Sequence, residues 1–157
     1  MVRIVLPQVD PCYDGAGTTI INIKPYLFFN GTARDAITHY AKVFGVEIPP
    51  LMTMEDAPPG MDLPPERRNW IMHCELTIGD SGIYLSDDAA ANSPAMEGAS
   101  MMVSLATAKE AKRIFDGLAE GGTIRMPWEP TFWSAGFGTL TDQFGIRWMV
   151  GTDEAPK

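Results

Sequence analysis

An internal repeat constrains the fold of this 157-residue chain more than any other feature. The first unit begins with the apolar run 20–29, and Asn30-Gly31 separates that run from a helical pattern. Thr32 followed by Asp35 matches a capping box at the helix start, and Gly45 is suited to end the helix. The apolar residues at helical spacing between these signals are Ala33, Ala36, Ile37, Tyr40 and Phe44.

The second unit has the same order of signals. An apolar run at 99–106 precedes Thr107, which has Glu110 three residues later, and Gly121-Gly122 follows the helical pattern. The apolar positions of this second helix are Ala108, Ala111, Ile114, Phe115 and Leu118. Strand-like segments follow each helix, at 47–54, 70–78 and 82–86 in the first unit and at 123–131, 137–141 and 146–150 in the second. The order strand, helix and three strands therefore occurs twice, which predicts an α+β fold.

These signals also predict how the chain is divided. The proline-rich stretch 49–65 is expected to form a long loop within the first unit. The predicted parts are an N-terminal extension at 1–19, a first module at 20–87, a linker at 88–98, a second module at 99–151 and a tail at 152–157.

Charge and composition exclude several classes of partner. Twelve Lys and Arg stand against 20 Asp and Glu, and a net charge of −8 argues against nucleic acid as a partner. The chain has no apolar segment near the roughly 20 residues of a membrane span and no signal-peptide pattern, so we expect a cytoplasmic protein without membrane contact. Two cysteines are too few for a disulfide framework, and Cys74 lies in an apolar strand pattern typical of a buried thiol.

Short segments in both units carry a family resemblance. They are Pro25-Tyr-Leu-Phe-Phe-Asn-Gly31, Met72-His-Cys-Glu-Leu76, Leu85-Ser-Asp87, Leu118-Ala-Glu-Gly-Gly122 and the run from Phe137 to Trp148. With these segments the chain resembles the vicinal oxygen chelate superfamily, which includes glyoxalase I, extradiol dioxygenases and bleomycin-resistance proteins, and within it the PhnB-like branch. The resemblance implies two βαβββ modules whose sheets curve into a cup with the helices on its outer face. It also implies a homodimer.

The resemblance also implies where a metal would bind. Metal-using members place His or Glu in the first and last strand of each module, and the matching positions here are Pro25, Ser86, Ser100 and Met149. Proline has no donor side chain, serine is a poor ligand and a thioether is a soft one. We therefore predict no cofactor and no metal ligand. Ser86, Ser100 and Met149, together with Tyr84, are instead predicted to line a ligand pocket in the cup.

Strand periodicity points to one pair of candidate catalytic residues. Along 70–78 one face is apolar and carries Trp70, Met72, Cys74, Leu76 and Ile78, while the other carries Ile71, His73, Glu75 and Thr77. If the apolar face packs beneath the helices, His73 and Glu75 lie side by side in the cup. A carboxylate beside an imidazole favours the imidazolium form, which suits an acid–base pair. The alternative is a solvated or interface strand face without chemistry.

The remaining histidine and the tryptophans allow further predictions. His39 lies off the apolar stripe of the first helix and is predicted to be a solvated helix residue. Trp148 alternates with apolar neighbours, which indicates a core position. Trp128 and Trp133 have Gly and Pro around them and are predicted to form the rim of a pocket for an apolar or aromatic ligand, with a core position as the alternative.

Three functions remain open from the sequence. The first, which we favour, is a protein that binds a small, apolar or aromatic molecule in the cup without the usual metal. The second is an enzyme, such as a metal-dependent lyase or dioxygenase, acting on a small oxygenated substrate through His73 and Glu75. The third is a structural or regulatory dimer with no ligand. Proteins of this branch are sometimes labelled methyltransferases, but no glycine-rich nucleotide turn supports that activity here.

Overall fold

The computed structural model describes residues 22–58, 60 and 63–156, so the predicted extension at 1–19 lies outside the described residues. The first module consists of β1 (Tyr26–Phe29), α1 (Ala33–Phe44), β2 (Met52–Thr53), β3 (Ile71–Ile78) and β4 (Ser81–Asp87). Two short 3-10 helices, η1 (Met54–Asp56) and η2 (Pro65–Arg67), lie between β2 and β3. The second module consists of β5 (Met101–Leu105), α2 (Ala108–Ala119), β6 (Thr123–Glu129), β7 (Phe137–Thr141) and β8 (Arg147–Thr152).

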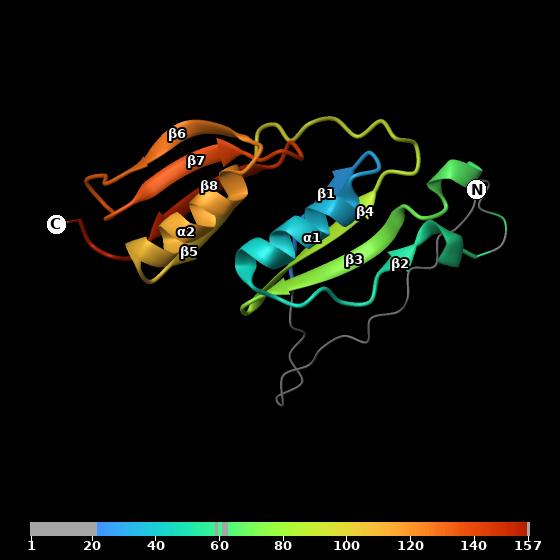
Figure 1. Ribbon diagram of the computed structural model, residues 1–157, viewed down its shortest axis with the longest axis horizontal. Coiled ribbons are helices and arrows are strands. Elements are labelled where there is room, and N and C mark those ends of the chain that lie inside the picture. Colours follow the sequence, from blue (N-terminus) through green and yellow to red (C-terminus); the bar gives the residue numbers. More distant parts are fainter. Residues whose placement is uncertain (1–21, 59, 61–62, 157) are drawn as a thin grey trace, which may run out of the picture.

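The strands form two four-stranded mixed sheets with equivalent topology. The first sheet has the order β1-β4-β3-β2 and the second the order β5-β8-β7-β6. In each, the first strand of the module pairs in parallel with the last, and the other neighbours are antiparallel. The modules lie side by side, with α1 over the first sheet and α2 over the second (Figure 1). The predicted α+β fold of two βαβββ modules is confirmed. Neither described helix is long and apolar enough to cross a membrane.

The N-terminus of α1 is capped from a distant strand. The Thr32 side chain makes no capping hydrogen bond, so the predicted capping box is wrong. Asp87, at the end of β4, takes its place: Oδ1 accepts from the backbone N–H of Gly31 at 2.8 Å and of Ala33 at 3.0 Å. Its Oδ2 accepts from the N–H of Ile71 at 2.9 Å. One buried carboxylate therefore joins the helix start to the start of β3.

The start of α2 combines a local and a distant cap. Thr107 Oγ1 accepts from the N–H of Glu110 at 3.3 Å, so the predicted threonine cap is present. Glu154, which follows β8, accepts from the N–H of Ala108 at 2.9 Å. The predicted end of α1 is also confirmed, because Gly45 has φ 68° in the left-handed region.

A buried carboxylate connects the two modules. The Tyr40 hydroxyl of α1 donates to Asp142 Oδ2 at 2.6 Å, and Trp148 Nε1 of β8 donates to the same oxygen at 2.8 Å. Asp142 Oδ1 accepts from the N–H groups of Phe144 and Ile146, both at 2.9 Å. Burial raises the pKa of the Tyr40 hydroxyl, and Asp142 is only 4% exposed. The apolar faces of both helices and both sheets consequently share one core.

Strand β3 follows the predicted alternation only in part. Cys74 and Leu76 are buried in the core beneath α1, as predicted, and burial raises the pKa of the free Cys74 thiol to about 11. Ile71 was predicted on the opposite face, and this is wrong because Ile71 is fully buried in the core. The reason is a β-bulge. Met52 of β2 pairs with His73 and the next residue, Thr53, pairs with Ile71, so Met72 has no partner on β2.

Candidate functional site

Each sheet has one face that its helix does not cover, and these two open faces contain most of the predicted site residues. We define the faces from strand alternation, the pairing register and burial. The first open face consists of Lys24, Tyr26, Phe28, His73, Glu75, Tyr84 and Ser86. The second open face consists of Ser100, Met102, Met126, Phe137, Thr139, Arg147 and Met149.

Aromatic rings dominate the first open face. The Tyr26 ring stacks on Phe28 with centroids 4.7 Å apart and an interplanar angle of 9°, and it lies 5.5 Å from the Tyr84 ring. His73 is 5.1 Å from Tyr84, and its Nδ1 lies 2.9 Å from the Tyr26 hydroxyl oxygen. Burial raises the pKa of Tyr26, so its hydroxyl is protonated at neutral pH and can donate to or accept from Nδ1 according to the His73 tautomer. Tyr26 and Phe28 nevertheless remain 41% and 52% exposed, so the stack is accessible to a ligand.

His73 and Glu75 both lie on the first open face but have different partners. Glu75 accepts a hydrogen bond and forms an ion pair with Lys24, and this contact raises the pKa of the Lys24 ammonium. The Lys24 ammonium also lies 5.4 Å from the centre of the Tyr84 ring. His73 is held by Tyr26 instead. That His73 and Glu75 act together as an acid–base pair stays a prediction.

The other predicted ligand residues divide between structural and accessible positions. Ser86 is buried, and its Oγ lies 2.9 Å from the carbonyl oxygen of Met72, so its hydroxyl can satisfy the β3 bulge. Tyr84 is half-buried on the same face. Met149 is half-buried on the second open face, where it pairs with Met102, and Ser100 directly precedes β5 on that face.

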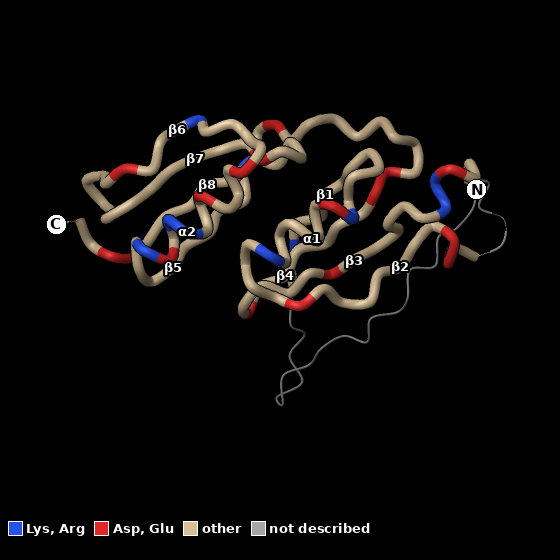
Figure 2. Tube along the Cα trace, viewed as in Figure 1, with Lys and Arg blue, Asp and Glu red and all other residues tan. Residues whose placement is uncertain are grey.

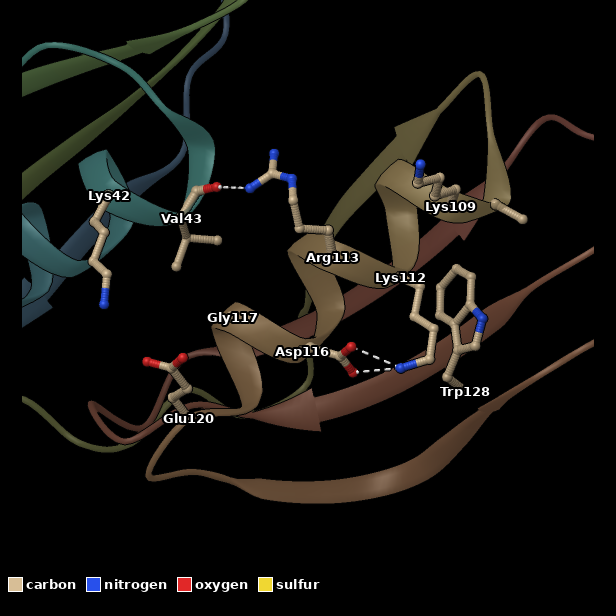
Figure 3. A pocket seen from close by; sticks show the side chains of 10 residues that line it. Lys42, Val43, Lys109, Lys112, Arg113, Asp116, Gly117, Glu120 and Trp128 are labelled. Atoms are coloured by element: carbon tan, nitrogen blue, oxygen red, sulfur yellow. Dashed lines mark hydrogen bonds and ion pairs between the residues drawn. The ribbon is translucent and has the colours of Figure 1, made fainter.

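The two predicted rim tryptophans lie on different sides of the second sheet. Trp128 packs beside α2 with its ring 5.7 Å from Phe115, and it borders a groove of about 690 Å³ that extends along α2 to the end of α1 (Figure 3). It is therefore on the helix side and not on the second open face. Trp133 is 53% exposed in the loop before β7, and its ring lies 5.8 Å from Phe137. Trp133 thus borders the second open face.

Three of the six charged residues that line the groove beside Trp128 are engaged in contacts within the protein. Lys112 forms an ion pair with Asp116 at 2.7 Å, and Arg113 donates to the carbonyl oxygen of Val43 at 2.9 Å (Figure 3). These contacts connect α2 to itself and to α1.

Two other predictions from the sequence have different outcomes. Trp148 is 2% exposed and belongs to the core, in agreement with its alternation with apolar residues.

His39 was predicted to be a solvated helix residue, and this is wrong. Its ring packs 5.8 Å from Phe144 of the second module, and its Nε2 is buried without a hydrogen-bond partner among the described residues.

The four positions at which the resemblance implies metal ligands do not fit a divalent ion here. The Ser86 hydroxyl faces backbone carbonyls, and Pro25, Ser100 and Met149 offer no ordinary ligand for such an ion. In the part of the chain that the structure describes, no group of three His, Cys, Asp or Glu side chains could hold a metal ion. We therefore derive no chemistry through a metal.

Comparison with known proteins identifies the family. Residues 21–151 match a family described as 3-demethylubiquinone-9 3-methyltransferase. The chain belongs to this family. It is 34% identical to protein YjdN of Escherichia coli K12 over 139 residues, which are 82% of this chain and 92% of that protein. It is 36% identical to protein PA1353 of Pseudomonas aeruginosa, with a TM-score of 0.77 and coverage of 86% and 99% of the two chains.

Two further solved structures share the fold. The PhnB protein of Bacillus cereus is 25% identical, covers 84% of this chain and 99% of its own, and has a TM-score of 0.70. A glyoxalase/bleomycin resistance protein of Albidiferax ferrireducens shares the fold, with a TM-score of 0.56 at 12% identity and coverage of 82% and 95%. The predicted resemblance to the PhnB-like branch is confirmed, and the fold is also that of a glyoxalase/bleomycin resistance protein.

Sequence reasoning missed several residues of the open faces. Lys24, Tyr26 and Phe28 alternate along the first strand, so the periodicity used for 70–78 could have identified them. Their contact with His73 and Glu75 could not be read in the same way, because it depends on the order of strands in the sheet. Arg147 was likewise overlooked, although it alternates with Trp148 and must lie opposite that core residue.

Proposed function

We propose that this protein binds a small apolar or aromatic molecule on its open sheet faces, without a divalent metal at the four family positions. The observation that supports the proposal is the accessible Tyr26–Phe28 stack. It lies next to the hydrogen-bonding groups of His73, Glu75 and Lys24. A ligand site of this kind combines an apolar surface with a few polar groups that fix orientation.

The stack would give a planar ligand a flat contact surface. Aromatic pairs contribute about 0.5–1.5 kcal/mol beyond the effect of their buried area. The polar groups beside the stack would then distinguish ligands with a hydroxyl or carbonyl oxygen from plain hydrocarbons. The Tyr26–His73 contact keeps one of these groups in place.

A ligand screen tests the proposal. Protein dialysed against EDTA would be titrated with indole, 2-naphthol and 4-nitrophenol and followed by thermal unfolding and by NMR, since a ligand that binds only the native state raises its stability. We expect at least one of them to bind, and Phe28→Ala to weaken that binding by about tenfold while the protein stays folded. Phe28 is half exposed, so its truncation removes little of the core.

The matched control is Phe132→Ala. Phe132 is 91% exposed and contacts Trp133 beside the second open face, so this variant removes an exposed phenyl ring without touching the first open face. Equal loss of affinity in the two variants would contradict a site on the first open face. A complete lack of binding by all three compounds would contradict the proposed ligand class.

We also propose that the protein forms a homodimer. Each sheet ends in edge strands, β1 and β2 in the first and β5 and β6 in the second, and proteins tend to cover such edges. The open faces also expose large apolar side chains, with Phe28 at 52% and Met102 at 54%. Sedimentation at micromolar concentration should give twice the 17.2 kDa mass of one chain. A species of 17.2 kDa alone would refute this.

A further inference from the structure

A cationic cavity lies at one end of the second open face. It has a volume of about 440 Å³ and is bounded by residues 95–98 of the linker, by β6 and β7, and by the start of β8. Arg125 and Arg147 both line it, together with Thr141. Most of the chain's charge is negative and is spread over loops and helices (Figure 2). Around this cavity, two guanidinium groups stand against one carboxylate, that of Glu97.

Neither arginine is neutralised by the described part of the protein. The two ion pairs found there involve Lys24 and Lys112, and no carboxylate lies within 4.0 Å of the guanidinium of Arg125 or Arg147. The Nε of Arg147 is moreover buried and has no hydrogen-bond partner among these residues. A buried donor without an acceptor is unfavourable, so this side chain is not satisfied by the described part of the protein.

The backbone around Arg147 is well fixed. Arg147 pairs with Thr141 of β7, and its N–H donates to Met96 Sδ of the linker at 3.4 Å. The linker therefore lies against the start of β8 and forms a wall of the cavity. A guanidinium can bind two oxygens of a carboxylate or phosphate at once through its parallel N–H groups.

An apolar strip continues from the cavity along the second open face. Met149 is two residues beyond Arg147 and is flanked by Met102 on β5 and Thr139 on β7. Phe137, which pairs with Gly151, comes next along the same direction but is only 8% exposed. Each two-residue step along a strand covers about 7 Å, so the accessible strip of Met102 and Met149 lies roughly 7 Å from Arg147.

We infer that the second open face binds an organic oxyanion, with its carboxylate or phosphate on Arg125 and Arg147 and its apolar part on the methionine strip. This inference rests on the proposed function, because it defines the chemical class of the ligand that the open faces take. Glu97 also lines the cavity and opposes an anion there. Removal of its charge should therefore strengthen binding.

Two pairs of compounds test the inference. 4-Phenylbutanoate is compared with 4-phenylbutanamide, and phenyl phosphate with phenol, by NMR titration of the full-length protein. The two pairs distinguish a carboxylate from a phosphate ligand. We expect at least one anion to bind about tenfold more tightly than its neutral counterpart, since a charge-assisted, bidentate contact is among the stronger hydrogen-bonding arrangements.

Variants test whether the tighter binding of the anion depends on the cavity. Arg147→Gln and Arg125→Gln should each abolish most of the preference for the anion, and Glu97→Gln should increase it. The control is Arg34→Gln, which removes the same charge from α1, where Arg34 donates to the carbonyl oxygen of Asn69 at 3.1 Å. Arg125 is exposed, so its variant should fold even if the Arg147 variant does not.

The outcomes separate the inference from the proposed function. If the anions and their neutral counterparts bind equally well, the proposed function stands and the oxyanion site is overturned. If Arg34→Gln reduces the preference as much as Arg147→Gln and Arg125→Gln do, the effect is one of overall charge and the site is likewise overturned. If none of the four compounds binds at millimolar concentration, the oxyanion site is overturned. The proposed function is then judged by the separate aromatic screen.

Discussion

Replacing Asp142 by alanine should lower the free energy of unfolding by about 3–5 kcal/mol, which is a large part of the stability of a protein of this size. The variant leaves the Tyr40 hydroxyl and the Trp148 indole N–H without their acceptor inside the core. It also frees two backbone N–H groups of the turn before β8. Equilibrium unfolding in urea measures the change.

A double-mutant cycle with Tyr40→Phe isolates the contact between the modules. Tyr40→Phe alone should cost about 1 kcal/mol, because it removes one hydrogen bond and leaves Asp142 with its three other donors. In the Asp142→Ala background the same change should cost less than that or stabilise, since no acceptor remains for the hydroxyl. Full additivity of the two changes would contradict a direct contact between these residues.

Asp87→Ala should destabilise the protein by about 2–4 kcal/mol. The carboxylate accepts three backbone hydrogen bonds, from Gly31, Ala33 and Ile71, and these N–H groups lose their partner together. Unfolding in urea gives the total effect. Amide hydrogen exchange at the three N–H groups shows whether the loss is confined to the start of α1 and the start of β3.

Thr32→Ala is the matched control for that prediction. Thr32 occupies the N-cap position but makes no side-chain capping bond, so its truncation should change stability by no more than about 0.5 kcal/mol. If Thr32→Ala were the more damaging of the two, the helix would be capped locally, as the sequence pattern suggested, and the role given to Asp87 would be incorrect.

The arrangement of elements was predictable because it depends on periodicity within short segments. Both helices follow the predicted apolar stripes, and Gly45 ends α1 where expected. Local pattern failed where a partner distant in sequence decides the structure. The α1 cap comes from the end of β4, and the expected strand at 47–54 is reduced to Met52–Thr53 because only these residues pair with β3.

In the candidate site, too, local periodicity predicted some features, and partners distant in sequence decided the others. Alternation correctly placed His73 and Glu75 on one face of β3, but it misplaced Ile71, since a single bulged residue reverses the alternation on one side of it. It also could not indicate that Tyr26 and Lys24 are the partners of this pair, because parallel pairing of β1 with β4 brings them together. Trp128 was placed at a rim from its neighbours alone, and its packing on Phe115 depends on α2.

The Tyr40–Asp142 contact has a consequence for how the chain can change over evolution. The two halves share one architecture but are not interchangeable, because the hydroxyl comes from the first and its acceptor from the second. The corresponding turn of the first half has Gly79 and Asp80, both exposed, and provides no reciprocal acceptor in the core. Replacement of the second half by a copy of the first would therefore leave the Tyr40 hydroxyl in the core without an acceptor. Residues on the open faces are free of this constraint, so ligand preference can diverge while the link between the halves is kept.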